Sequence, residues 1–128
     1  MFVLYLLIMR TILIIGAGRS ASSLIHYLLN KSEKENLHLI IGDLSLALAE
    51  KKTNNHPNAT PISLDIFDEN QRKKAIQKAN IVISMLPAHL HIEVARDCIL
   101  YKKHLVTASY ISDAMQELDA AAKADNLV

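Results

Sequence analysis

The chain has 128 residues, of which 51% are hydrophobic and 21% are charged. This length and composition are typical of one globular domain and argue against a disordered chain. Lys and Arg number 14 and Asp and Glu number 13, so the net charge is +1 and gives no sign of a nucleic-acid-binding surface. The single cysteine, Cys98, excludes an internal disulfide and leads us to expect a reducing, cytoplasmic setting.

Residues 1–8 are interpreted as an apolar N-terminal extension that precedes the domain at residues 9–128. The apolar run MFVLYLLIM is much shorter than the roughly 20 residues that span a bilayer. No basic region precedes this run, and no small-residue cleavage site follows it. We therefore expect neither a membrane anchor nor a secretory signal.

Short apolar runs alternate with helical patterns along the rest of the chain. The predicted strands are Thr11–Ile15, Leu37–Ile41, Thr60–Leu64, Ile81–Ser84 and His104–Thr107. The predicted helices cover residues 20–30, 45–52, 69–77, 90–101 and 112–124. Nearly continuous apolar runs suit strands that are buried on both faces. The alternation predicts an α/β fold, a doubly wound Rossmann-type parallel sheet of five or six strands, with helices on both faces and the first strand near its centre.

Two side-chain patterns in the predicted helices are interpreted as structural. Asp68 is expected to cap the helix that runs to about residue 77. The basic run Arg72, Lys73 and Lys74 in the same helix is interpreted as a solvated face.

Cysteine and histidine offer little chemistry in this sequence. Cys98 lies among apolar residues and is expected in the core rather than as a nucleophile. His89 and His91 are two residues apart, which places them on different faces of a helix. We therefore expect no metal site.

A glycine-rich turn follows the first predicted strand. Gly16, Gly18 and Ala21 form the pattern G-x-G-x-x-A at the point where a strand ends and a helix begins. The first glycine permits the sharp turn, the second lets a diphosphate approach the backbone, and the alanine lets helix and strand pack closely. Ser20 can donate from its hydroxyl, whereas Arg19 lies near the phosphates or the adenine or else faces solvent. The alternative is a tight bend without a ligand.

Gly42 and Asp43 follow the second predicted strand, and Asp43 lies 22 residues after Ala21. A carboxylate at this spacing can accept hydrogen bonds from both hydroxyls of an adenosine ribose, and it repels a 2′-phosphate. The next residue is Leu44 rather than an arginine, so NAD is favoured over NADP, although Ser45 can still contact a phosphate. The structural alternative for Asp43 is a helix N-cap.

Three later segments end predicted strands at the same edge of the sheet. Asp65 and Ile66 can flank an adenine, although Asp65 can equally be a loop aspartate. The segment Ser84–Pro87 borders the ribose or nicotinamide end of a dinucleotide, because proline keeps the preceding residue extended. The segment Thr107–Ser112 adds hydroxyls and the phenol of Tyr110, which is more often a half-buried packing residue than a substrate contact.

Four blocks together resemble the N-terminal domain of saccharopine dehydrogenase. They are ILIIGAGRSA, LDIFDENQ, NIVISMLPAHLHIEVARDCI and HLVTASYISDAMQELDAAAKA, and the resemblance covers residues 9–128. It implies an NAD(P)-dependent oxidoreductase of lysine metabolism, in which a second domain serves substrate binding and dimerisation. The glutamate-forming branch converts saccharopine, NAD(P)+ and water to L-glutamate and 2-aminoadipate 6-semialdehyde, or the reverse.

The resemblance also assigns roles by position. It implies that the diphosphate is bound by Gly16, Gly18, Arg19, Ser20 and Ala21. Asp43 and Leu44 would border the adenosine ribose, and Asp65 and Ile66 the adenine. Leu86 and Ser109 would approach the nicotinamide half, and Ser109 and Tyr110 would contact the amino-acid substrate. No catalytic acid or base is identifiable. Because the family's acidic substrate motif lies beyond Val128, we expect these residues to bind dinucleotide without turning over saccharopine.

Two other functions share the glycine turn and the ribose aspartate. One is a regulatory NAD(H)-binding module, such as the ligand-sensing domains attached to potassium channels. The other is a related reductase that acts on a polyamine-type imine. The segments SMLP and SYIS around a substrate crevice favour the saccharopine dehydrogenase type over a regulatory module.

Overall fold

The computed structural model describes residues 8–128, so the predicted extension lies outside the described residues except for Ile8. Five parallel strands form one sheet in the order β3-β2-β1-β4-β5, with β1 at its centre. The strands are β1 (Arg10–Ile15), β2 (Leu37–Asp43), β3 (Ala59–Ser63), β4 (Ile81–Ser84) and β5 (His104–Thr107). The helices are α2 (Ser22–Glu35), α3 (Leu46–Thr53), α4 (Glu69–Gln77), α5 (His91–Leu100), α6 (Asp113–Gln116) and α7 (Asp119–Ala124), with 3₁₀ turns η1 (Arg19–Ala21) and η2 (Ala88–Leu90). The predicted doubly wound α/β fold is confirmed.

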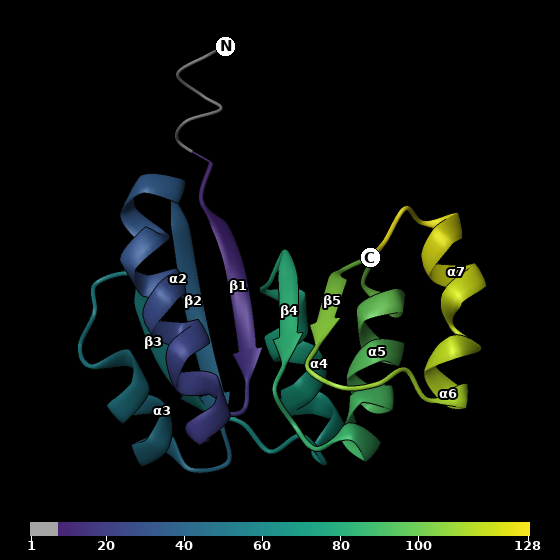
Figure 1. The fold of residues 1–128 in the computed structure, drawn as a ribbon, viewed down its shortest axis with the longest axis horizontal. Coiled ribbons are helices and arrows are strands. Elements are labelled where there is room, and N and C mark those ends of the chain that lie inside the picture. Colours follow the sequence, from purple (N-terminus) through teal and green to yellow (C-terminus); the bar gives the residue numbers. More distant parts are fainter. Residues whose placement is uncertain (1–7) are drawn as a thin grey trace.

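The central strand β1 is buried on both faces because its alternating side chains enter two separate core clusters. Ile12 and Ile14 pack with the apolar residues of α2 and α3. Leu13 and Ile15 pack with those of α4 and α5. Helices therefore cover both faces of the sheet, with α2 and α4 on opposite sides (Figure 1). A strand buried on both faces needs a continuous apolar run, which explains the sequence of β1.

Two predicted helices differ from the structure by more than a one-residue shift of their ends. The helix predicted over residues 20–30 extends to Glu35, because it ends only where Asn36 adopts a left-handed conformation with φ 53°. The helix predicted over residues 112–124 is two short helices, α6 and α7. Each has its own start signal, since the Ser112 hydroxyl accepts from the Met115 N–H at 3.2 Å and Asp119 is acidic in the first turn of α7.

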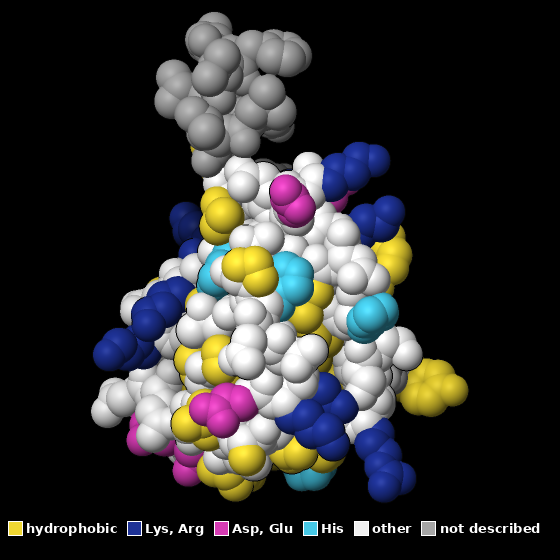
Figure 2. Space-filling model, turned by 90° about the vertical axis from the view of Figure 1, so that its left-hand side faces the viewer, with side chains coloured by type: hydrophobic (Ala, Val, Ile, Leu, Met, Phe, Trp, Pro, Cys, Tyr) yellow, Lys and Arg dark blue, Asp and Glu magenta, His cyan; other side chains and the backbone are white. Residues whose placement is uncertain are grey.

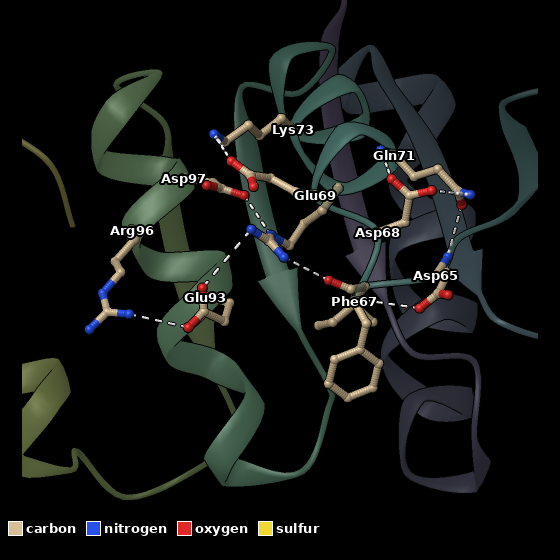
Figure 3. Close-up of polar contacts among 11 residues, drawn as sticks. Asp65, Phe67, Asp68, Glu69, Gln71, Lys73, Glu93, Arg96 and Asp97 are labelled. Carbon is tan, nitrogen blue, oxygen red and sulfur yellow. Dashed lines mark hydrogen bonds and ion pairs between the residues drawn. The ribbon is translucent and has the colours of Figure 1, made fainter.

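The interpretation of the basic run in α4 as a solvated face is wrong for its first residue, Arg72. Arg72 is buried, and its Nε donates to Asp97 Oδ2 at 2.6 Å while its Nη1 donates to the Ile66 carbonyl at 2.7 Å (Figure 3). Lys73 is half-buried and pairs with an acidic residue one turn earlier, and Lys74 is exposed. Arg72 can be buried because α5 places a carboxylate opposite it. The predicted Asp68 cap is confirmed, since its side chain accepts from a backbone N–H of the first turn of α4.

The surface carries charges of both signs. Figure 2 shows Lys and Arg side chains in several places on one face of the molecule, with Asp and Glu side chains between them. Within residues 8–128, no helix is long and apolar enough to cross a membrane.

Candidate functional site

The turn after β1 needs glycine at its first position for reasons internal to the protein. Gly16 has φ +105°, a conformation that side chains with a Cβ rarely adopt. A Cβ at this position would also lie 3.2 Å from the Met85 carbonyl oxygen. The Gly16 N–H donates to the Gly42 carbonyl at 2.8 Å, which ties the turn to β2. Gly16 is therefore explained by the bend alone.

The second glycine of the turn has no such internal reason. Gly18 has φ −72°, which any residue adopts, and a Cβ added there would meet nothing within 4 Å. The protein itself therefore leaves open space at this exposed position, and a group from outside can approach the backbone there. Neither the residue before η1 nor the residue before α2 makes a side-chain cap, so the backbone N–H groups of this helix start lack a side-chain acceptor. These residues fit a diphosphate group, as the glycine motif predicts.

Asp43 connects the end of β2 to the glycine turn. Its Oδ2 accepts from the Ala17 N–H and its Oδ1 from the Ser45 N–H, both at 2.8 Å. The alternative of Asp43 as helix cap is wrong, because the Ser45 hydroxyl caps α3 by accepting from the Leu48 N–H at 3.3 Å. Each carboxylate oxygen can accept a second hydrogen bond. The ribose role predicted for Asp43 is thus compatible with the contacts it makes inside the protein.

The remaining residues predicted around the phosphates and ribose lie at the surface, except for Ala21. Arg19 and Ser20 are exposed, whereas Ala21 is fully buried and lets η1 approach the sheet. Leu44 is 72% exposed. An exposed apolar side chain beside Asp43 leaves that position without a cation.

The segment predicted to flank the adenine is held by its own contacts. Asp65 Oδ1 accepts from the Phe67 N–H at 2.9 Å, and the Asp65 N–H donates to Gln71 Oε1 at 3.1 Å (Figure 3). The side chain of Ile66 packs in the core cluster of α4 and α5, and its carbonyl accepts from Arg72. The structure therefore turns the Ile66 side chain inward, and only Asp65 of this pair has a polar side chain at the edge.

A buried histidine joins the ends of β4 and β5. His91 Nδ1 lies 2.9 Å from Ser84 Oγ, and His91 Nε2 lies 2.8 Å from Ser109 Oγ. Burial lowers the pKa of His91 and favours its neutral form. The spacing of His89 and His91 in the sequence bears only on metal binding and does not predict this contact. The available signal was the serine that ends the otherwise apolar strand IVIS.

The other residues predicted at the nicotinamide and substrate end differ in exposure. Leu86 is half-buried and packs against the core cluster of α4 and α5. Ser109 is half-buried and held by His91. Tyr110 is 99% exposed, so its interpretation as a half-buried packing residue is wrong. Cys98 is buried as predicted, and burial raises the pKa of its thiol to about 12.

The predicted site residues thus follow the carboxyl ends of parallel strands and share one edge of the sheet. Hydrogen bonds join the glycine turn to Asp43 on one side of β1 and join Ser84, His91 and Ser109 on the other. Among residues 8–128, no three His, Cys, Asp or Glu side chains are grouped so that they could hold a metal ion. The fold and the glycine turn define a dinucleotide-binding domain of the Rossmann type.

Comparison with known proteins identifies the family. The saccharopine dehydrogenase NADP binding domain matches residues 12–128, and the chain belongs to this family. The chain is 36% identical over 94 residues to alpha-aminoadipic semialdehyde synthase of Arabidopsis thaliana. The matched region covers 73% of this chain and 9% of that protein. It is 35% identical over 114 residues to the NADP(+), L-glutamate-forming saccharopine dehydrogenase of Schizosaccharomyces pombe, covering 89% of this chain and 25% of that protein.

Solved structures agree with this assignment. Apo saccharopine dehydrogenase (L-Glu forming) from Saccharomyces cerevisiae superposes with a TM-score of 0.82 and 28% identity, over 93% of this chain and 26% of that chain. A 3-ketoreductase from Actinomadura kijaniata in complex with NADP has a TM-score of 0.71 at 17% identity, which shows a shared fold alone. The chain spans about a quarter or less of the length of these saccharopine-related proteins. The family assignment favours the oxidoreductase hypothesis over a regulatory module.

Proposed function

We propose that this domain binds the diphosphate of a nicotinamide dinucleotide at the turn that contains Gly18, with the dinucleotide lying across the carboxyl edge of the sheet. The observation that carries the proposal is the open space at Gly18. Its conformation does not require glycine, and the helix start beside it has backbone N–H groups without a side-chain cap. Asp43 bonds this turn from the end of β2 and is proposed to bind the ribose, whereas Ser109 follows β5 on the other side of β1 and is proposed to lie near the nicotinamide.

Titration of the purified 128-residue chain with NADH and NADPH, followed by the fluorescence of the reduced nicotinamide, tests this proposal. Gly18→Asp places a negative charge where the diphosphate is expected, so we expect it to abolish binding of both dinucleotides. Asn30→Asp is the matched control, because it adds the same charge to the exposed surface of α2 outside the turn. No binding by the unaltered chain, or equal binding by the Gly18→Asp variant, would overturn the proposal.

We also propose that the site prefers NAD(H) to NADP(H). Asp43 is a carboxylate at the expected ribose position, and the exposed Leu44 that follows supplies no cation for a 2′-phosphate. The names of the family and of the fission-yeast relative specify NADP, so the proposal distinguishes this chain from them. Parallel titrations with ADP-ribose and 2′-phospho-ADP-ribose test the preference directly, because these ligands differ only in the phosphate. Tighter binding of the 2′-phosphorylated ligand would contradict it.

Saccharopine is the substrate that we propose for the protein to which this domain belongs. The support is the family assignment together with the L-glutamate-forming relatives. A bound nicotinamide dinucleotide supplies hydride transfer, and Ser109 and Tyr110 are the side chains proposed to face the amino acid. The protein purified from its natural source should reduce NAD(P)+ when saccharopine is added. Turnover of a polyamine-type imine in place of saccharopine would favour the alternative reductase.

The 128-residue chain alone is proposed to bind dinucleotide without turnover. On the proposed nicotinamide side, the buried imidazole of His91 already bonds the hydroxyls of Ser84 and Ser109. Incubation of the purified chain with saccharopine and NAD+ should therefore produce no NADH while binding remains measurable. Saccharopine-dependent NADH formation by this chain would contradict the proposal.

A further inference from the structure

His91 bridges two neighbouring strands just beyond the point where their pairing ends. Ser84 and Thr107 are the last paired residues of β4 and β5. Ser109 lies two residues past that pair, and the His91 ring connects its hydroxyl to that of Ser84. His91 is 2% exposed and Ser84 is 0% exposed, whereas Ser109 is half-buried. The ring thus reaches from the core to a hydroxyl at the edge of the sheet.

The hydrogen-bond network assigns the tautomer of this ring. A neutral imidazole has one N–H donor and one acceptor nitrogen, so it donates to one serine and accepts from the other. The Ser84 hydroxyl is buried, and a buried O–H that finds no acceptor costs about 1–3 kcal/mol. His91 Nδ1 is positioned to accept from it at 2.9 Å. The ring proton is therefore on Nε2, which donates to Ser109 Oγ.

This tautomer has a consequence for Ser109. Because Ser109 Oγ accepts from His91, its own O–H is not used in that bond and can donate to a ligand. In the opposite tautomer, Nε2 would accept a hydrogen bond from the Ser109 O–H. Ser109 could then only accept a hydrogen bond from the ligand. His91 thus determines whether Ser109 donates to a ligand or accepts from it, although His91 itself is buried.

We propose that His91 is a positioning residue that holds Ser109 as a hydrogen-bond donor toward the nicotinamide end of the bound dinucleotide. This role rests on the proposed dinucleotide binding. It assigns Ser109 a specific polarity and gives His91 a function through Ser109 rather than through direct contact with the ligand. It also explains why a polar pair, Ser84 of β4 and His91 of α5, is buried beside an apolar core cluster.

Two isosteric variants separate the two contacts of the ring. In His91→Gln the side-chain amide nitrogen takes approximately the position of Nε2, so it can still donate to Ser109. In His91→Asn the side chain reaches only the position of Nδ1, so it can contact Ser84 but not Ser109. We expect His91→Asn to weaken NADH binding by about fivefold, the effect of losing one hydrogen bond. His91→Gln should restore most of the affinity, and Ser109→Ala should match His91→Asn without adding to it in the double variant.

ADP-ribose, which lacks the nicotinamide, distinguishes failure of this inference from failure of the proposed function. If the chain binds neither ADP-ribose nor NADH, the proposed function is overturned and the role of His91 falls with it. If both ligands bind, the His91→Asn variant should keep its affinity for ADP-ribose and lose affinity only for NADH. Equal loss for both ligands would indicate a purely structural role, and no loss for either would also overturn the inference. The ¹⁵N shifts of the His91 ring in the ligand-free chain should show a neutral ring protonated at Nε2, and a proton on Nδ1 contradicts the inference independently of binding.

Discussion

Arg72 of α4 and Asp97 of α5 form a buried ion pair, with 2.6 Å between Nε and Oδ2. The same guanidinium donates to the Ile66 carbonyl at 2.7 Å and lies 4.0 Å from Glu93 Oε2 (Figure 3). One side chain therefore links two helices on the same face of the sheet to the segment that follows β3. Because that segment also contains Asp65, the ion pair helps to hold in place the residues that are proposed to flank the adenine.

Removal of one partner of this pair should be strongly destabilising. Asp97→Ala leaves the buried Arg72 charge without its carboxylate, and we expect the free energy of unfolding to fall by about 3–5 kcal/mol. Glu93→Ala is the matched control on α5, since it removes a half-exposed carboxylate that lies 3.2 Å from Arg96 and only 4.0 Å from Arg72, and it should cost about 0–1 kcal/mol. Urea unfolding of both variants measures the difference. Equal effects of the two substitutions would show that the buried pair contributes no more than an exposed one.

Most of the fold could be predicted because the strands are local patterns. The bounds of β4 and β5 agree with the predicted runs 81–84 and 104–107, where apolar residues stand between polar turns. The predicted ends of the helices agree less well with the structure. The end of α2 depends on the left-handed conformation of Asn36, and the division between α6 and α7 depends on a second start signal within one helical pattern.

The glycine turn should respond differently to alanine at its two glycines. Gly16→Ala forces a Cβ onto a residue with φ +105° and against the Met85 carbonyl, so we expect a loss of about 1–3 kcal/mol in the free energy of unfolding. Gly18→Ala adds a methyl group in open space, so stability should be unchanged while dinucleotide affinity decreases. Thermal unfolding and NADH titration of both variants check this. A Gly18→Ala variant that binds NADH normally would show that the open space does not receive the ligand.

The ribose position can be tested by addition of a cation. Leu44→Arg replaces an exposed side chain next to Asp43, and we expect it to raise the affinity for NADPH by about fivefold, since one exposed ion pair contributes on the order of 1 kcal/mol. NADH affinity should change little. Leu48→Arg is the matched control, because it adds the same charge to an exposed position of α3 farther from Asp43. If both variants raise NADPH affinity equally, the effect comes from net charge and not from the ribose position.

The site was only partly predictable, for a physical reason. The contact between the glycine turn and Asp43 could be expected, because the spacing of these residues is fixed by one strand and one helix. The roles of Arg72 and His91 depend on which side chains meet across separate elements, as Arg72 meets Asp97 25 residues away and His91 meets Ser109 18 residues away. A charge run or a pair of histidines carries no information on those distances.

The buried His91 should make the stability of the chain depend on pH. Its pKa is lowered by burial from the ordinary value of 6.5, so on acidification the unfolded chain binds a proton at a higher pH than the folded chain does. The stability contributed by the neutral ring is therefore fully present above pH 6.5 and is lost as the pH falls from there through the lowered pKa. We expect the free energy of unfolding of the unaltered chain to decrease more steeply on acidification below pH 6.5 than that of His91→Gln. Urea unfolding over a pH series measures both slopes, and the other five histidines are common to both proteins and cancel. Identical slopes would mean that His91 gains its proton equally well in the folded and unfolded states.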